Sequence, residues 1–244
     1  QYLFAALLTG DDARKSSAGQ VLMCLVAVED SIVYELFVKN EQILATIEDN
    51  MNLYGLLETV LELMKLEEVK KVQSIAWICD RNFIGKLLET LMTTDSIDTI
   101  GNISGFIHNV VLWKVSSVES PALEFITRFN QDPALPRFVE HVFASTDDFL
   151  VEQCFRIISN ILACSTVLTY HDTENLQGIF TALLPHIAKF KDIFTSRRIG
   201  NITNNLVYII LSLVLSGFQA VYDTLIENNV FAAIMDVFYA DHLC

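Results

Sequence analysis

The stretch DDFLVEQCFRIISNIL, from Asp147 to Leu162, carries the pattern that decides the fold of this chain. Its apolar residues recur three and four positions apart: Cys154, Ile157, Ile158, Ile161 and Leu162. This spacing gathers them on one broad face of an α-helix. Asp147 and Asp148 precede the run, where a carboxylate caps free backbone N–H groups and complements the helix dipole. The stretch therefore predicts a capped helix with a buried side.

The same spacing continues along the chain, and turn-forming residues are scarce. Only 9 glycines and 4 prolines occur in 244 residues, which is too few for the many turns of a sandwich or barrel. We therefore expect an all-α protein. The expected helices cover residues 2–9, 17–29, 31–38, 40–49, 51–66, 68–79, 81–93, 96–113, 121–130, 132–144, 147–165, 173–194, 199–215, 218–228 and 229–240.

Four strongly apolar segments recur, near residues 21–28, 103–113, 154–164 and 205–215. Within the last three, Asn109, Asn160 and Asn205 follow one another at intervals of 51 and 45 residues. Armadillo and HEAT units repeat about every 40–47 residues. We therefore predict an armadillo/HEAT-like α-α superhelix, an α-solenoid in which each unit contacts mainly its neighbours, as a single domain over residues 1–244.

A membrane span is not expected, although 52% of the residues are hydrophobic. The longest charge-free stretch, from Ile199 to Tyr222, is interrupted by asparagine, serine and glutamine. Its purely apolar part, Leu206–Leu211, is far shorter than the roughly 18 residues that a span needs. We interpret it as a buried core helix. A membrane-embedded bundle is the weaker alternative.

Charge and cysteine content restrict the partners and the compartment. The net charge of −14 repels phosphate backbones and anionic lipids, so nucleic acid is an unlikely partner on electrostatic grounds. The five cysteines are odd in number, and no two form a CxxC pair. This usage is typical of free thiols in a reducing, cytoplasmic or nuclear compartment.

The sequence lacks the patterns that carry catalysis, metal binding or cofactor binding. No two of its five histidines stand three or four residues apart, and no GxSxG, GxGxxG or P-loop pattern occurs. The adjacent acidic pairs, such as Asp11-Asp12, point about 100° apart on a helix and do not form a dyad. We expect no enzyme activity, no metal and no cofactor. A helical hydrolase or transferase site assembled from distant residues is the alternative.

Asparagines in apolar helices are the most suggestive feature. Asn109, Asn160 and Asn205 occur as HNVV, SNIL and NNLV. On the concave side of a solenoid, such amides would donate to and accept from the backbone of an extended partner. Alternatively, each amide satisfies a neighbouring loop or carbonyl inside the stack. The sequence leaves both interpretations open.

Several segments, taken in order, resemble the SAPS-domain family, the regulatory subunits of protein phosphatase 6. Tyr2–Leu8 (YLFAALL) resembles the opening helix of the family, and Tyr54–Leu63 (YGLLETVLEL) resembles its leucine-rich helix. The further similar segments are Asp80–Leu91 (DRNFIGKLLETL), the Asn102-Ile103-Ser104 motif, the helix Val151–Leu162, Ile199-Gly200-Asn201 with Asn205, and the ending from Asn229 to Phe238.

The resemblance implies a non-catalytic helical-repeat subunit. It would bind a phosphatase-6-type serine/threonine phosphatase catalytic subunit, often together with an ankyrin-repeat subunit, and direct it to substrates in the cytoplasm and partly in the nucleus. We expect the partner-binding residues on the asparagine-bearing helices: Asn102, Asn109, Asn160, Asn201 and Asn205. The main alternative is another armadillo- or HEAT-type adaptor for trafficking, the cytoskeleton or cargo.

Overall fold

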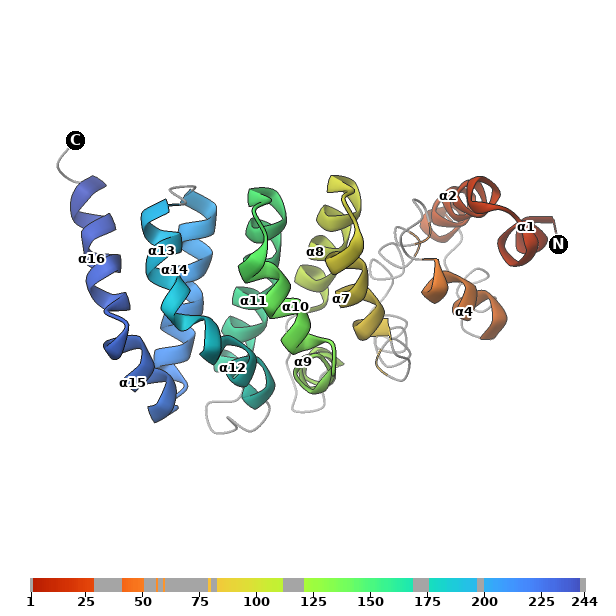
Figure 1. The fold of residues 1–244 in the computed structure, drawn as a ribbon. Coiled ribbons are helices and arrows are strands. Elements are labelled where there is room, and N and C mark those ends of the chain that lie inside the picture. Colours follow the sequence, from red (N-terminus) through yellow and green to blue (C-terminus); the bar gives the residue numbers. More distant parts are fainter. Residues whose placement is uncertain are drawn as a thin grey trace. The chain divides into compact units, whose positions relative to one another are not determined.

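The computed structural model confirms an all-α fold in the part of the chain that it describes. It describes residues 2–28, 41–50, 56, 59, 79, 83–111, 121–168, 176–196 and 200–241. These residues form helices joined by short turns and contain no β-strand (Figure 1). The helices expected at 31–38, 51–66 and 68–79 lie outside the described residues, apart from single positions.

Most expected helices are found within a few residues of their predicted bounds. The first six are α1 (Tyr2–Thr9), α2 (Asp12–Val28), α4 (Glu41–Asp49), α7 (Phe83–Thr93), α8 (Ile97–Val111) and α9 (Pro121–Gln131). The others are α10 (Leu135–Ala144), α11 (Asp148–Leu168), α12 (Gln177–Leu183), η2 (Leu184–His186), α13 (Ile187–Ser196), α14 (Gly200–Leu215), α15 (Gln219–Glu227) and α16 (Val230–Asp241).

Two helix starts, one predicted and one not, show how aspartate caps act in this chain. The backbone N–H groups of Phe149 and Leu150 donate to Asp147 Oδ1 over 2.9 and 3.3 Å, so Asp147 caps α11 as expected. In α2 the N–H of Arg14 donates to Asp11 Oδ1 over 3.0 Å. This cap explains why α2 begins at Asp12 and not at residue 17.

The chain divides into two compact units, an N-terminal unit (residues 1–128) and a C-terminal unit (residues 129–244). In the N-terminal unit, α1 packs against α2 and α4, and Lys15 Nζ donates to Asn50 Oδ1 over 3.1 Å. Phe106 of α8 joins Phe83 of α7 to Phe125 of α9, with ring centroids 6.1 and 6.3 Å apart. The single helical-repeat domain over residues 1–244 stays a prediction.

In the C-terminal unit, α11 and α14 make the most extensive helix contact. α10 packs on α12, and α13 packs on α16. Phe143 connects four elements of this interior: its ring lies 5.3 Å from Phe155, 4.9 Å from His186 and 5.7 Å from Phe190, measured between centroids. Phe155 and Phe190 are fully buried, so an aromatic cluster lies in the core of this unit between α10, α11, η2 and α13.

The single helix predicted over residues 173–194 was wrong, because the chain forms α12, a 3₁₀ turn and α13. Pro185 has no N–H to donate and its ring collides with the carbonyl of the preceding turn, so an α-helix cannot run straight through it. The N–H of Ile187 bonds the carbonyl of Leu184 instead, as a 3₁₀ turn requires. The break lets α12 and α13 contact different neighbours.

A close approach of backbones fixes α12 against the end of α9. The N–H of Ile179 donates to the Oδ1 of Asn130, over 3.1 Å, and Asn130 is buried. A Cβ atom on Gly178 would overlap the backbone carbonyl of Asn130. Only glycine fits here without displacement, since the obstacle is backbone and not a flexible side chain.

Candidate binding surface on α11 and α14

α11 is buried over most of its circumference, as its sequence predicts. Between Val151 and Ala163 its accessible positions form one stripe: Glu152, Arg156 and Asn160 are half-buried, and Ala163 is exposed. These residues stand three or four positions apart, so they lie on one side of the helix. The remaining sides carry the core residues, among them Cys154, Ile158 and Leu162.

α14 differs from the buried core helix that its apolar sequence predicts. An outer stripe of five exposed residues, at intervals of three and four, runs along it: Asn201, Asn204, Tyr208, Leu211 and Leu215. Tyr208, Leu211 and Leu215 are 58, 50 and 66% exposed. Large apolar side chains are thus accessible to solvent along two turns of the helix, directly after a row of amides.

Hydrogen bonds fix how the two helices lie against each other. Asn201 Nδ2 donates to Glu152 Oε1 over 3.0 Å, and Ser159 Oγ donates to Asn205 Oδ1 over 3.5 Å. Both bonds join positions that advance in the same sense along each helix, so α11 and α14 run parallel. The α11–α14 surface, defined here as the two stripes together, is polar where the helices begin and apolar towards Ala163 and Leu215.

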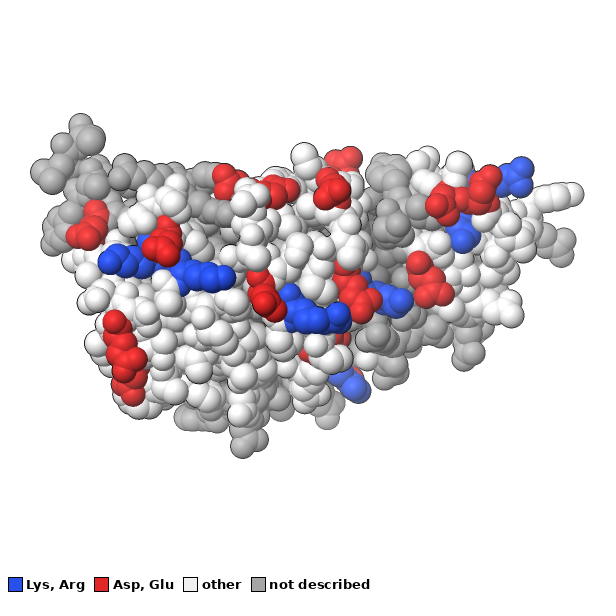
Figure 2. All heavy atoms as spheres, in the orientation of Figure 1, with Lys and Arg blue, Asp and Glu red and all other residues white. Residues whose placement is uncertain are grey.

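Besides Glu152 and Arg156 of the α11 stripe, exposed charged residues of the C-terminal unit gather on two other helices. α10 and α13 carry exposed Arg137, Glu140, Lys189, Lys191 and Asp192. Figure 2 shows Lys, Arg, Asp and Glu side by side over these two helices, with α14 lying behind α13 in the same orientation in Figure 1. The outer stripe of α14 itself contains no charged residue, so its exposed surface is made of amide and apolar side chains.

The structure places three of the five predicted asparagines on one pair of helices. Asn160, Asn201 and Asn205 belong to the α11–α14 pair, whereas Asn102 and Asn109 lie on α8 in the N-terminal unit. Asn109 and Asn201 are exposed, and the other three are half-buried. The bonds of Asn201 and Asn205 tie neighbouring helices together. A ladder of amides that binds a partner's backbone stays a prediction.

Sequence reasoning missed Tyr208, Leu211 and Leu215. Their spacing of three and four residues continues that of Asn201 and Asn204, and this signal was present in the sequence. It was hidden because α14 is apolar on nearly every side, so the pattern does not separate an exposed stripe from a buried one.

Among the described residues of the C-terminal unit, Cys154 and His186 have shifted pKa values, and both side chains pack in its interior. Burial, with a smaller contribution from Asp147, raises the pKa of the Cys154 thiol far above its ordinary range. The thiol therefore stays protonated and behaves as a small apolar group. Burial, followed by Lys189, lowers the pKa of His186, while Glu140 acts in the opposite direction. His186 stacks on Phe143 with a 2° angle between the ring planes.

Neither a metal centre nor a membrane helix is found in the described part of the chain. Its His, Cys, Asp and Glu side chains form no group of three that could hold a metal ion. Within the same residues, none of the helices combines the length and the apolar character required to cross a bilayer.

Comparison with known proteins does not assign a family. No family model matches the sequence, and no curated protein matches it significantly. Two structures of engineered proteins from the Northeast Structural Genomics Consortium are similar to the chain. The first is 13% identical with a TM-score of 0.42, over 95% of this chain and 62% of the other, so this chain spans less than two thirds of its length. The second is 15% identical with a TM-score of 0.34, over 88% and 96%.

Proposed function

We propose that this chain is a non-catalytic scaffold subunit that binds a partner protein on the α11–α14 surface. The observation that carries the proposal is the outer stripe of α14, where Tyr208, Leu211 and Leu215 are each at least half exposed. Contiguous apolar side chains on a surface mark interaction sites, because their burial by a partner releases ordered water.

The two ends of this surface would contribute differently to binding. Tyr208, Leu211 and Leu215 would serve as anchors, since a few desolvated aromatic and aliphatic side chains dominate the energy of most interfaces. Asn204 stands four residues before Tyr208 on the same stripe, and its exposed amide offers donors and an acceptor that fix the register of a bound segment without adding charge. A partner segment fits this arrangement if its apolar side chains face Tyr208, Leu211 and Leu215 and its unpaired backbone N–H and C=O groups face the amide end of the stripe.

The partner that we propose is a phosphatase-6-type serine/threonine phosphatase catalytic subunit. Support for this choice comes from the ordered resemblance of the sequence to the SAPS-domain family. The metal-dependent chemistry would then belong to the catalytic subunit, and this chain would act by placement. Tethering the phosphatase beside a substrate raises their effective concentration without any new catalytic group. Such a subunit would work in the cytoplasm, and in part in the nucleus.

A binding experiment with purified components tests both the proposed surface and the proposed partner. The chain is immobilised, and binding of a purified phosphatase-6-type catalytic subunit is measured by interferometry. We expect Tyr208→Ser with Leu211→Ser and Leu215→Ser to weaken binding by about tenfold or more, because each substitution removes an anchor. A second variant carries alanine at all five predicted positions: Asn102, Asn109, Asn160, Asn201 and Asn205.

The matched control places the same change on other exposed apolar residues. Val21, Leu25 and Ile97 are 49, 40 and 62% exposed and lie in the N-terminal unit. Serine at these three positions should leave binding unchanged. Full binding by the Tyr208, Leu211 and Leu215 variant, with unaltered circular dichroism, would contradict the α11–α14 surface. Absence of phosphatase binding by the unmodified chain would favour another armadillo- or HEAT-type adaptor.

A further inference from the structure

A second apolar surface lies on α15 and α16. Tyr222 and Ile226 stand four residues apart on α15, and Phe231 and Met235 stand four apart on α16. Each pair therefore lies on one side of its helix. The rings of Tyr222 and Phe231, with centroids 6.2 Å apart, join the two pairs into one surface. We call these four residues the C-terminal apolar strip.

The strip is accessible and held by a defined turn. Tyr222, Ile226 and Met235 are 42, 49 and 49% exposed, and Phe231 is half-buried. Only Asn228 and Asn229 connect the helices, and Asn229 adopts a left-handed conformation with φ of 54°. Its N–H bonds the carbonyl of Ile226 over 2.9 Å. This conformation ends α15 and starts α16 without a loop, so the strip has a fixed geometry.

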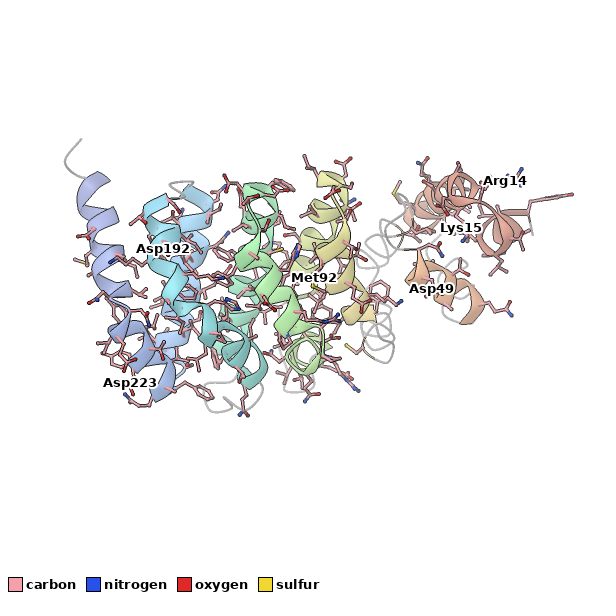
Figure 3. All side chains as sticks on the ribbon, in the orientation of Figure 1. Arg14, Lys15, Asp49, Met92, Asp192 and Asp223 are labelled. Atoms are coloured by element: carbon pink, nitrogen blue, oxygen red, sulfur yellow. The ribbon has the colours of Figure 1, made fainter. Side chains whose placement is uncertain are left out.

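The charged residues of the two helices that carry the strip are all carboxylates. Asp223 and Glu227 are exposed on α15, and Asp236 is exposed on α16 beside Met235. The sequence contains no lysine or arginine from Ile199 to Cys244. Figure 2 accordingly shows Asp and Glu, and neither Lys nor Arg, over α15, and Asp223 lies at the outer edge of this helix in Figure 3. Within α15 and α16 the apolar strip is therefore flanked by negative charge alone. The exposed Lys189 and Lys191 belong to α13, which packs against both helices.

We propose that the C-terminal apolar strip binds an amphipathic α-helix of a partner protein, with an apolar face flanked by lysine or arginine. The apolar face would cover Tyr222, Ile226 and Met235, and the flanking cations would lie opposite Asp223, Glu227 and Asp236. A helix fits better than an extended strand, because the described residues offer no open sheet edge. The complementary rim charges would speed association and set the orientation.

The same charges disfavour two other occupants. A second copy of this chain, docked symmetrically, would bring the three carboxylates against the same three carboxylates. An anionic lipid surface would be repelled by the carboxylates beside the strip and by the net charge of −14. The proposal does not depend on the α11–α14 surface, since none of the residues of that surface belongs to the strip.

The test uses two labelled synthetic peptides and the whole chain. Each peptide has about 18 residues, or about five helical turns, with leucine repeating three and four positions apart. One carries lysine on both flanks and the other carries glutamate at the same positions. In fluorescence anisotropy we expect the lysine peptide to bind at least about tenfold more tightly, with an affinity that falls as salt rises.

Two pairs of variants separate specific docking from general attraction to an acidic protein. Tyr222→Ser with Met235→Ser should abolish binding of the lysine peptide, whereas Val21→Ser with Ile97→Ser should not. Asp223→Asn with Glu227→Gln should weaken it several-fold, whereas Asp12→Asn with Asp95→Asn, also exposed, should leave it unchanged. If the double serine variant is unfolded by circular dichroism, Ile226→Lys on the exposed flank replaces it and should also abolish binding.

Four results would overturn the proposal. Equal weakening by both pairs of charge variants would mean nonspecific attraction, and equal affinity for the two peptides would remove the role of the rim. A dimer in sedimentation that the Tyr222 and Met235 variant dissociates would assign the strip to a second copy. Binding to vesicles containing anionic lipid, lost in the same variant, would assign it to a membrane surface.

Discussion

In the C-terminal unit, the aromatic interior and the outer stripe of α14 use similar side chains in opposite surroundings. Phe155 and Phe190 are fully buried around Phe143, whereas Tyr208 and Leu215 are more than half exposed. Residue type therefore does not decide which apolar side chains hold the fold and which remain for a partner. Substitutions in the aromatic interior should therefore lower the free energy of unfolding strongly, whereas substitutions in the outer stripe should leave it nearly unchanged.

The largest effect is expected for Phe155→Ala. Removing a fully buried ring leaves a cavity beside Phe143, so the free energy of unfolding should fall by about 3–5 kcal/mol. Urea unfolding followed by circular dichroism measures it. Phe155→Leu, which retains most of the volume, should lose clearly less. A loss below about 1 kcal/mol for alanine would mean that the cluster is loosely packed.

A smaller loss is expected for Gly178→Ala, where the obstacle is backbone. The new Cβ must displace either α12 or the carbonyl of Asn130, so we expect a loss of about 1–3 kcal/mol. Gly105→Ala in α8 is the matched control, since a Cβ there meets no atom within 4 Å. It should stabilise the protein by about 0.5–1 kcal/mol through helix propensity. Equal effects of the two changes would contradict the close approach at Gly178.

His186 should make the stability of this interior depend on pH. Its pKa is lowered in the folded chain, mainly by burial, and its Nδ1 is buried without a hydrogen-bond partner among the described residues. The unfolded chain therefore binds a proton first as pH falls. The stabilising contribution of neutral His186 is complete above its ordinary pKa of 6.5 and is lost as pH drops below it.

The pH effect is measured by comparing the unmodified chain with His186→Phe, which retains a ring against Phe143. Thermal unfolding is followed between about pH 7.5 and pH 5, a range that spans the ordinary pKa of histidine. The unmodified chain should lose more stability than the variant over this range. Identical profiles would show that His186 has the same pKa in the folded and the unfolded chain.

The smallest effect on stability is expected for Tyr208→Ser in the outer stripe. Its side chain is 58% exposed, so the free energy of unfolding should change by no more than about 0.5 kcal/mol. The same variant should lose affinity for a partner of the α11–α14 surface. A loss of several kcal/mol would instead identify Tyr208 as a core residue, and the contrast between the two regions would disappear.

Local chemistry made much of the fold predictable from the sequence. Asp147 marks the start of α11 because its carboxylate lies within reach of the next free N–H groups. Pro185 carried a readable signal for the break between α12 and α13, although the apolar periodicity across residues 173–194 favoured one continuous helix. The binding surface was less predictable. That Asn201 meets Glu152 depends on the register of α14 against α11, and such a tertiary contact has no signature in either helix alone.

The positions of individual cysteines show the same limit. Cys79 and Cys154 are buried, in keeping with their apolar surroundings in the sequence. Cys24 stands in an equally apolar run, VLMCLV, and is nevertheless exposed. Periodicity identifies the helix at each site, but the packing of neighbouring helices determines which side of it faces solvent.

The 3₁₀ turn at Leu184–His186 has a mechanical consequence. α12 is anchored on α10 and α13 is anchored on α16, so these three residues are the tether between two separately held supports. A force that pulls α16 and α13 outward reaches α10 through the backbone of the turn and through the rings of His186 and Phe190, which both stack on Phe143. Tension on α16 would thereby act on the aromatic cluster around Phe143.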